Sequence, residues 1–579
     1  MHDNFKNKWV ITSIESNFNY GLLKIQLKTN KYALYMEQNL LFFKNNVSFY
    51  YSGYILEREQ NAKGLSKYEL LYELYIQYGV DFIKYIKGNF VILIFDNDKF
   101  YVFSDRFGVK KFFTWSNDNS FIISNDLKLI LQNVSVKPSL NNIAIYALTY
   151  HFINGKTIFE DINYNKPAEM INYQNSRLKF SQYWDAGELL SRGKKNILIS
   201  DLSDILAKSV EKSLFANTSS RISLSLTGGA DTRNLLSIFL RMGIKPHLYT
   251  YGNPKSDDCV KATNIAKGLK LEHVIQDIDM QSELFITYSK KIIKLGQGLA
   301  SIHRAHRLIA VEKEKQYANT MFLGTLGGEF IKGVSEDDYI IPSIVYDNWD
   351  NSSITAKQLC KYLNNKKLQE TNIEIDMLLK YLNNQLYFKG DKTRRKLYSL
   401  SYITASLHDA QAVNLYDTVM NMVYTPFLDI DYLEILFSSQ FTFHNKEVIS
   451  NKYLRRIENP IFASRFLSNT YPPLLDYEYS GEHKPKEVLF NKYIAAIIKT
   501  VRKKNRGSYP PNFPLIDWMT KFVNTELPKC NDYKILKDVF DIDGLILELN
   551  KNKHIPVESY WLKFTNPIMM KYILDEFAN

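Results

Sequence analysis

The chain has 579 residues, with 73 Lys and Arg against 61 Asp and Glu, so its formal net charge is +12. Hydrophobic residues make up 45% of it and aromatic residues 14%, a composition that excludes disorder as the dominant state. At roughly 100–200 residues a domain, two to four domains are expected. The three cysteines, Cys259, Cys360 and Cys530, are too few and too scattered for a disulfide framework or a four-cysteine zinc site.

The N-terminal residues carry charges at several positions and lack the apolar core of a secretory signal. No apolar run approaches the roughly 18 residues that span a bilayer. We therefore expect a cytoplasmic protein without a membrane span. The positive charge would suit an acidic partner or a nucleotide, but a lysine-rich solvated surface is the simpler interpretation.

The first third of the chain has short strands separated by turns. Val91–Phe95 and Lys99–Phe103 flank a polar turn, which predicts a β-hairpin. One helix is predicted at Ser66–Tyr78, where leucines recur at helical spacing. The segment up to Asp185 is therefore predicted to form a β-rich α+β domain.

After Asp185 helices and strands alternate. A helix at 199–214 precedes an apolar strand at 222–226, a glycine turn and a helix at 233–242, and a strand at 247–251 and a helix at 258–269 follow. This succession is typical of a parallel βαβ arrangement. From about residue 350 onward the pattern is mostly helical.

The sharpest local signal is the stretch Ser-Leu-Thr-Gly-Gly-Ala-Asp-Thr-Arg at 225–233, between an apolar strand and an amphipathic helix. Two glycines permit a close approach, and the N-terminus of the helix offers N–H groups to an anion such as phosphate. Thr227 and Thr232 add hydroxyl donors, and Asp231 is interpreted as a Mg²⁺ ligand because a carboxylate reaches phosphate only through a cation. The absence of Gly-Lys-Ser/Thr excludes a Walker A loop. An isolated glycine turn usually has only a structural role. Whether this one binds a ligand has to be judged from the other motifs of the chain.

The turn resembles the pyrophosphate-binding loop of the N-type ATP pyrophosphatases, Ser-Gly-Gly-x-Asp-Ser, with Thr in place of both serines. The whole chain resembles the asparagine synthetase family, because four further stretches occur in the family's order: 88–91 with 104–113 and 183–184, then 249–252 with 257–273, then Leu-Gly-Thr-Leu-Gly-Gly-Glu at 323–329, and Pro-Phe-Leu-Asp at 426–429. The resemblance covers roughly residues 50 to 480.

This resemblance implies a combined α+β and α/β fold. Residues 1–185 would form a class II glutaminase-like domain of the Ntn-type αββα architecture. Residues 186–490 would form a Rossmann-like ATP-pyrophosphatase synthetase domain, and 491–579 a helical C-terminal extension.

In that family ATP activates a carboxylate as an acyl-adenylate with release of pyrophosphate, and a nitrogen nucleophile then displaces AMP to form an amide. The resemblance implies ATP and Mg²⁺ as cofactors. It assigns pyrophosphate and Mg²⁺ to Thr227, Gly228, Gly229, Asp231 and Thr232, and assigns backbone contacts with the adenosine to Leu226, Tyr251 and Gly324. Asp258 is a weaker candidate near the nucleotide, since an Asp that opens a helix is equally well explained as an N-cap.

Five positions depart from the family pattern. His2 stands where a working class II glutaminase exposes a cysteine nucleophile after loss of the initiator methionine, so we expect no glutamine hydrolysis by the first domain. Thr325 and Gly328 replace two of the family's carboxylates, which leaves Glu329 as the second metal candidate beside Asp231.

Met422 and Tyr424 stand where asparagine synthetases usually carry Glu and Arg, which argues against free aspartate as the substrate. The family also uses a downstream lysine to stabilise charge on the leaving pyrophosphate and the tetrahedral intermediate. Lys484 and Lys486 lie at about the right distance and are both candidates, with solvated loop lysines as the alternative.

The expected function is ATP-dependent, AMP-forming amide synthesis from a carboxylate. Relatives without the cysteine resemble lasso-peptide macrolactam cyclases and β-lactam-forming synthetases, in which a substrate amine replaces ammonia. The first is favoured, because a peptide suits the large, basic second half and because the β-lactam type normally has Tyr where Thr325 stands. Its partners would be a precursor peptide and maturation proteins.

Three alternatives remain open: an ammonia-dependent asparagine synthetase, a non-catalytic scaffold and a tRNA-modifying pyrophosphatase. The glutaminase-like first domain argues against the last, so nucleic acid is not expected as a partner.

Overall fold

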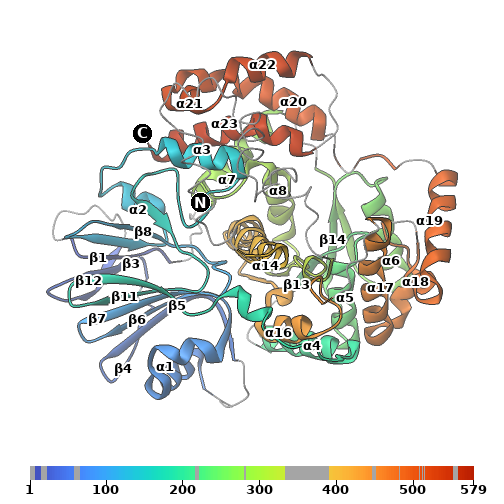
Figure 1. Ribbon diagram of the computed structural model, residues 1–579, viewed down its shortest axis with the longest axis horizontal. Helices are drawn as coiled ribbons and strands as arrows, with labels where there is room; N and C mark the ends of the chain where they lie inside the picture. The colour runs from blue at the N-terminus through green and yellow to red at the C-terminus, as the bar shows by residue number, and fades with distance from the viewer. Residues whose placement is uncertain are drawn as a thin grey trace.

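The computed structural model describes residues 7–14, 23–38, 40–57, 65–215, 221–278, 282–332, 390–445, 452–480, 483–506, 509–511, 513, 515–551 and 558–578. Two antiparallel sheets come first, a parallel sheet follows, and helices dominate the end of the chain (Figure 1). Across these ranges, none of the helices combines the length and apolarity that a bilayer crossing requires. His2 and Cys360 lie outside the described residues, and Cys259 and Cys530 are buried thiols.

Two six-stranded antiparallel sheets build the first third, in the orders β10-β8-β9-β1-β3-β2 and β12-β11-β7-β6-β5-β4. Side chains alternate along β1: Trp9 and Ile11 enter the core shared with Leu93 of the second sheet, while Val10 points to the opposite face. The strands are β1 (Trp9–Thr12), β2 (Lys24–Lys28), β3 (Ala33–Met36), β4 (Phe42–Lys44), β5 (Val47–Glu57), β6 (Ile86–Asp96), β7 (Lys99–Ser104), β8 (Phe113–Ser116), β9 (Phe121–Ser124), β10 (Ile162–Tyr164), β11 (Glu169–Gln174) and β12 (Arg177–Gln182).

Helices cover the outer faces of both sheets. The helix α1 (Lys67–Tyr78) and the 3-10 helix η1 (Gly79–Tyr85) pack Leu71 and Phe82 against Phe90 of the second sheet. On the first sheet, α2 (Leu127–Leu131) and α3 (Leu140–Thr149) share a core with Val10. The resulting layers follow the expected αββα order.

The local predictions for this domain are confirmed. The strands β6 and β7 pair antiparallel as a hairpin around Asn97, which adopts a left-handed backbone with φ 53°. The predicted helix begins one residue later than expected, because Ser66 is its N-cap and accepts the Glu69 N–H at 3.2 Å.

A five-stranded parallel sheet forms the centre of the second half, in the order β15-β14-β13-β16-β17. The strand order reverses between β13 and β16, and in such doubly wound sheets ligands bind at the carboxyl ends of the strands beside the reversal. The strands are β13 (Ile222–Ser225), β14 (His247–Tyr251), β15 (His273–Gln276), β16 (Thr320–Phe322) and β17 (Met422–Tyr424). The predicted strands at 222–226 and 247–251 are thus confirmed to within one residue.

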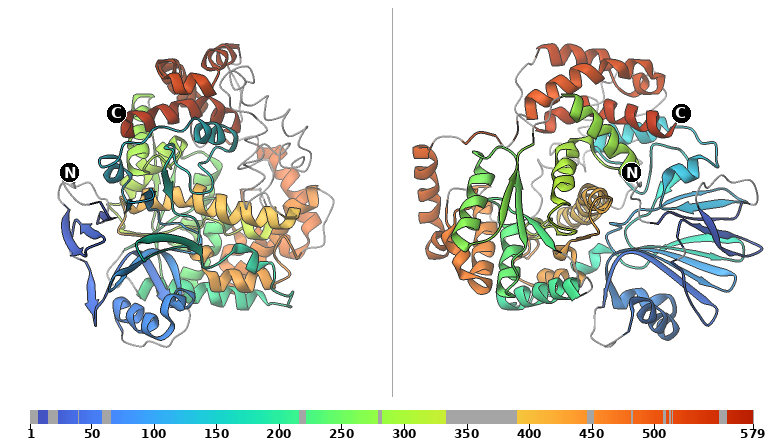
Figure 2. Two further views of the ribbon diagram at one scale, coloured as in Figure 1. Left: turned by 60° about the vertical axis from the view of Figure 1, so that its left-hand side comes forward. Right: turned by 180° about the vertical axis from the view of Figure 1, so that it is seen from behind.

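Helices flank this sheet on both sides (Figures 1 and 2). On one side, α4 (Ile199–Phe215), α5 (Asp231–Arg241) and α17 (Lys452–Thr470) pack together, and on the other α8 (Ala305–Glu314) packs against α15 (Ala410–Asp417). The remaining elements up to residue 506 are η2 (Ala186–Leu189), α6 (Asp257–Leu269), α7 (Ser282–Leu295), η3 (Ile302–Arg304), α9 (Glu329–Lys332), α14 (Lys392–Tyr398), the π-helical η5 (Ser399–Asp409), η6 (Pro426–Leu428), α16 (Ile430–Ser438), η7 (Pro472–Asp476), α18 (Pro485–Phe490) and α19 (Lys492–Arg506).

The end of the chain is helical, as expected, and it contacts both earlier parts of the molecule. The helices α20 and α23 pack on α7, and α21 packs on α3 of the first domain. The elements are α20 (Leu515–Glu526), η8 (Pro528–Asp532), α21 (Lys534–Val539), α22 (Ile542–Lys551) and α23 (Glu558–Phe577).

Buried polar contacts join the first domain to the parallel-sheet half. The Lys87 ammonium of β6 forms ion pairs with Asp429 and Asp431, both at 2.7 Å. Asp429 also accepts the Asp431 N–H at 2.9 Å and a hydrogen bond from Ser209, so it caps α16 as well. The aspartate of the Pro-Phe-Leu-Asp segment therefore holds the two parts together.

Candidate functional site

The loop between β13 and α5 is the predicted pyrophosphate turn. A Cβ added to Gly228 would lie 2.3 Å from Ser480 Oγ and 3.3 Å from Ser480 N, so a larger residue here would have to displace the Ser480 side chain. The Gly228 carbonyl accepts the Ser480 N–H at 2.9 Å, and the Gly229 N–H donates to Thr227 Oγ1 at 3.1 Å. The turn is therefore fixed both by its own threonine and by a segment about 250 residues away in the sequence.

Asp258 belongs to this turn. The N-cap position of α6 is occupied by Ser256, and the Asp258 carboxylate instead accepts the Gly228 N–H at 3.0 Å and the Ser480 hydroxyl at 3.3 Å. The alternative explanation of Asp258 as an N-cap is therefore wrong. Its carboxylate holds the glycine turn in place.

Arg233 is a fully buried cation beneath the same turn. Its guanidinium donates to the carbonyl oxygens of Tyr477 and Glu478, both at 2.7 Å, and lies 4.5 Å from the ring centroid of Tyr479. Burial lowers its pKa to about 10. No carboxylate of the described chain lies within ion-pair distance, so this positive charge favours an anion on the turn above it.

The N-terminus of α5 also favours an anion. The N-cap residue, Ala230, has no side chain that could accept the first N–H groups of the helix. Asn234 is the first residue whose N–H bonds back, to the Ala230 carbonyl at 2.8 Å. The N–H groups that precede Asn234 carry the partial positive charge of the helix dipole, and this charge favours an anion beyond the glycine turn.

A cavity of about 390 Å³ lies beyond the turn, at the carboxyl ends of β13, β14 and β16. This volume falls within the usual range for a small-molecule site, and the position next to the reversal of strand order is the expected one. Its walls are formed by Ser225, Thr227, Gly229, Asp231, Thr232, Tyr249, Tyr251, Arg307, Val311, Phe322, Leu323, Gly324, Thr325, Asp409, Ala412 and Tyr416.

The segment 323–329 packs tightly against the start of α5. A Cβ on Gly324 would lie 2.8 Å from Thr232 Cγ2, and one on Gly327 would lie 2.9 Å from Asp231 Cβ. This approach brings the carboxylates of Asp231 and Glu329 close enough to repel each other. Burial raises the pKa of Asp231 to about 7, and the charge of Glu329 adds to this effect.

Three buried oxygen atoms at this junction have no hydrogen-bond partner: Thr232 Oγ1, Thr325 Oγ1 and Glu329 Oε2. Buried polar atoms are almost always paired, so this set fits the oxygens of a phosphate and a hard divalent cation such as Mg²⁺. No group of three or more His, Cys, Asp or Glu gathers anywhere in the described ranges. A cation held by Asp231 and Glu329 would thus take its remaining ligands from phosphate and water.

Six of the predicted nucleotide-site residues line the cavity: Thr227, Gly229, Asp231, Thr232, Tyr251 and Gly324. Gly228 and Asp258 are not wall residues, but the hydrogen bond from the Gly228 N–H to Asp258 holds the turn in place. Leu226 is fully buried, its N–H donates to the Tyr249 carbonyl at 2.8 Å, and its own carbonyl accepts the Thr250 hydroxyl at 2.6 Å. Both backbone groups of Leu226 are therefore engaged within the sheet.

The two predicted lysines lie near the segment that covers the turn, and neither is among the residues of the cavity wall. The Lys486 side chain is 53% exposed and pairs with Asp476 at 2.5 Å. Lys484 is half-buried and directly precedes α18. The assignment of a catalytic lysine stays a prediction.

Sequence reasoning missed three polar residues of the cavity wall. Arg307 comes from α8, Asp409 from the end of η5, and Tyr416 from α15. No motif surrounds them, so no sequence signal marked them. Asp409 and Tyr416, together with Ala412, are the wall residues farthest in sequence from the glycine turn.

Comparison with known proteins agrees with these features. Residues 52–184 match the family model of the glutamine amidotransferase domain. Over 223 residues the chain is 23% identical to asparagine synthetase [glutamine-hydrolyzing] 3 of Bacillus subtilis (strain 168), which covers 36% of each protein. Over 207 residues it is 23% identical to amidase chry2 of Gibberella zeae, which covers 34% of this chain and 30% of that protein.

The chain spans about a third of the length of these curated relatives. Among solved structures, the NMN synthetase of Francisella tularensis aligns with 37% of this chain and 97% of its own, at 14% identity. Its TM-score of 0.21 is too low to assign a common fold. The domain match and the asparagine synthetase relative together support an asparagine synthase-like family, at low identity.

Proposed function

We propose that this asparagine synthase-like chain is an ATP-dependent amide synthetase that releases AMP and pyrophosphate. The observation that carries the proposal is one cavity that combines a glycine turn, an uncapped helix N-terminus and the carboxylate of Asp231, with the charge of Glu329 close behind it. Each of these features favours a phosphate chain with its cation, and together they match the site that the sequence motif implies.

The phosphate end of the site is built by the turn and α5. Thr227, Gly229 and Thr232 would hold the pyrophosphate portion of ATP, and Arg233 supports its negative charge from beneath. Asp231 and Glu329 would hold Mg²⁺, because Glu329 Oε2 is buried without a partner and burial raises the pKa of Asp231. The other carboxylate oxygen, Glu329 Oε1, pairs with Lys332 at 3.2 Å. When bound, ATP supplies the adenylyl group that activates the carboxylate and the pyrophosphate that leaves.

The adenosine end would lie against β14 and β16. Tyr251 and Gly324 are walls of the cavity there, and Tyr249 and Phe322 add aromatic surface on which a base can pack. The carboxylate substrate would then lie toward the remaining wall, where Arg307 from α8 and Asp409 from η5 provide opposite charges. A substrate with both a carboxylate and an amine suits such a wall.

The nitrogen donor that we favour is an amine of the substrate itself. A peptide with one acidic and one amino group would then close into a macrolactam, as the resemblance to lasso-peptide cyclases suggests. A precursor peptide and maturation proteins would be its partners.

Ammonia-dependent asparagine synthesis has less support. Tyr424, at the position where asparagine synthetases usually carry Arg, is 1% exposed and packs between Tyr54 and Phe322, with ring centroids 4.6 and 4.9 Å away. Its side chain belongs to an aromatic core and offers no charge to aspartate. A non-catalytic scaffold is disfavoured by the buried oxygen atoms that have no hydrogen-bond partner. Such atoms are costly unless a ligand pairs with them, so they favour a site that still binds one.

The test is product analysis with purified protein. The full chain is incubated with ATP, Mg²⁺ and either aspartate plus ammonium or acidic peptides that carry a free amine, and nucleotides and peptides are separated by chromatography and mass spectrometry. The proposal predicts AMP in equal amount to an amide product that has lost one water. Formation of ADP, or hydrolysis without any amide, would contradict it.

A further inference from the structure

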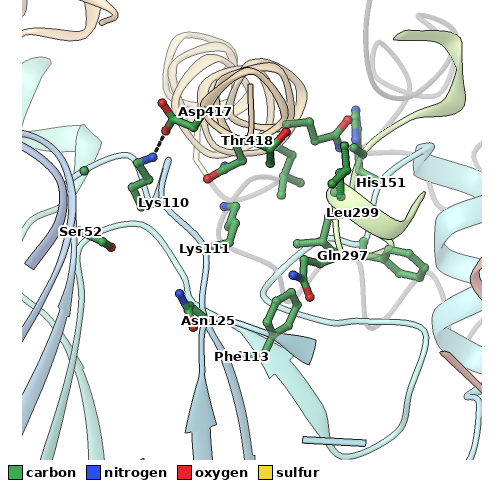
Figure 3. A pocket seen from close by; sticks show the side chains of 18 residues that line it. Ser52, Lys110, Lys111, Phe113, Asn125, His151, Gln297, Leu299, Asp417 and Thr418 are labelled. Carbon is green, nitrogen blue, oxygen red and sulfur yellow. Dashed lines mark ion pairs between the residues drawn. The ribbon is translucent and has the colours of Figure 1, made fainter. Parts of the chain in front are cut away.

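A second cavity, of about 130 Å³, lies where the first domain meets the helices of the second half (Figure 3). Lys110 and Lys111 reach it from the segment between β7 and β8, and Asp417 and Thr418 face them from the end of α15. His151 and Gln297 close the opposite side. This cavity is separate from the candidate nucleotide site, with which it shares no wall residue.

Lys111 is the unusual group in this cavity. Its ammonium donates to the Gly108 carbonyl at 2.5 Å and to the Ser406 hydroxyl at 3.3 Å, and no carboxylate in the described part of the chain lies within ion-pair distance. Burial lowers its pKa to about 7, and the more distant carboxylates of Asp105 and Glu169 do not offset this effect. The ammonium also lies 5.0 Å from the centroid of the Tyr164 ring, so the charged form of Lys111 meets dipoles and an aromatic face and has no carboxylate of the described chain as a direct counterion.

The other charged residues of the cavity wall do not neutralise a protonated Lys111. Lys110 forms an ion pair with Asp417, so these two charges cancel, and a protonated Lys111 gives the wall a net charge of +1 when His151 is neutral. One oxygen of Asp417, Oδ1, is buried without a partner. Next to these groups the wall is apolar, with Phe113, Phe152, Leu295, Leu299 and Leu407.

We propose that this cavity binds a small monocarboxylate, whose carboxylate pairs with Lys111 while its short hydrocarbon body packs against the phenylalanine and leucine side chains. A single negative charge neutralises the wall, whereas a neutral molecule or a dianion does not. The volume accommodates a molecule of several heavy atoms, since one water needs only about 10–15 Å³ by the same measure.

The two cavities lie on opposite faces of one helix. Gln411, Asn414 and Asp417 of α15 line the inter-domain cavity, whereas Ala412 and Tyr416 line the nucleotide cavity. These sets follow helical spacing, so each face of α15 serves one cavity. A ligand that binds on one face of α15 and shifts or stiffens this helix also changes the wall of the cavity on its other face. The carboxylate is therefore inferred to alter nucleotide affinity, and the coupling must be reciprocal.

The binding test uses the full chain, without ATP, and needs no enzymatic activity. Butyrate and its neutral isostere butyramide are titrated into the protein by calorimetry. We expect saturable, millimolar binding of butyrate and at least tenfold weaker binding of butyramide. Lys111→Met should weaken butyrate at least tenfold, Lys111→Arg should retain binding, and Lys99→Met, an exposed lysine on β7, should behave like wild type.

A lack of saturable binding by formate, acetate, butyrate and isovalerate would overturn the proposal, and so would equal affinity for butyrate and butyramide. If Lys111→Met does not fold, as judged by its melting curve, the comparison of acid with amide on the wild-type protein still decides. The coupling is tested by titrating ATP with and without saturating butyrate. An unchanged ATP affinity would refute the coupling through α15, and a failure of the proposed amide synthesis would leave the butyrate result unaffected.

Discussion

Gly324→Ala is expected to damage the nucleotide site through a displacement of α5. The added Cβ would lie 2.8 Å from Thr232 Cγ2, 3.0 Å from Thr232 N and 3.1 Å from Thr232 Cα, whereas ordinary contacts begin near 3.4 Å. These overlaps are relieved only if Thr232 and Gly324 move apart by about 0.3–0.6 Å. Because two of the three atoms belong to the backbone, the movement carries the first turn of α5 with it, including Asp231.

The magnitude follows from this geometry. Overpacking of this kind costs about 1–3 kcal/mol of unfolding free energy. Misplacement of a reacting group by about 1 Å costs about 100-fold in rate, so a shift of roughly half that size should cost about tenfold or more. Chemical denaturation measures the first quantity, and the rate of ATP–pyrophosphate exchange measures the second.

Gly193→Ala is the matched control, because a Cβ at Gly193 meets nothing within 4 Å. It should leave both stability and exchange close to wild type. Wild-type exchange by Gly324→Ala would refute the reasoning, since it would mean that the contact between segment 323–329 and α5 does not set the geometry of the site.

The remaining predictions concern charged groups around the turn. Asp231 has a folded-state pKa raised to about 7 from 3.8, so the wild-type protein loses stability as pH rises through this interval. Asp231→Asn should therefore raise the melting temperature at pH 8 without Mg²⁺, leave it unchanged near pH 3, and abolish exchange; a lower melting temperature at pH 8 would contradict this. Arg233→Met leaves the Tyr477 and Glu478 carbonyls without their donor and should destabilise the protein by about 1–3 kcal/mol and weaken ATP binding, measured by denaturation and calorimetry. Lys486→Ala removes only an exposed ion pair and should change stability by less than about 1 kcal/mol, so a large loss of stability would argue for a different role.

Much of the scaffold could be predicted from local sequence patterns. The turn at 226–230 was recognisable because strand, paired glycines and amphipathic helix follow directly on one another. The cap of α1 was within one residue because Ser66 and Glu69 form a capping box. Such elements are determined by interactions between residues close together in the sequence, so they can be predicted without the tertiary structure.

The parts of the site that depend on distant segments could not be predicted in this way. Arg307 and Asp409 reach the cavity from α8 and η5, which no motif connects with the glycine turn. Asp258 was ambiguous because the choice between an N-cap and a bond to Gly228 depends on how two βα units pack. The inter-domain cavity around Lys111 likewise exists only where two domains meet.

The central claim is that this site activates a carboxylate with ATP. The most direct measurement is ATP–pyrophosphate exchange with Mg²⁺, screened over aspartate, glutamate and acidic peptides, with Asp231→Ala beside the wild-type protein. The account predicts exchange that depends on one class of acid and disappears in Asp231→Ala. Exchange that persists in Asp231→Ala, or a folded protein that neither binds ATP nor exchanges with any acid, would contradict it.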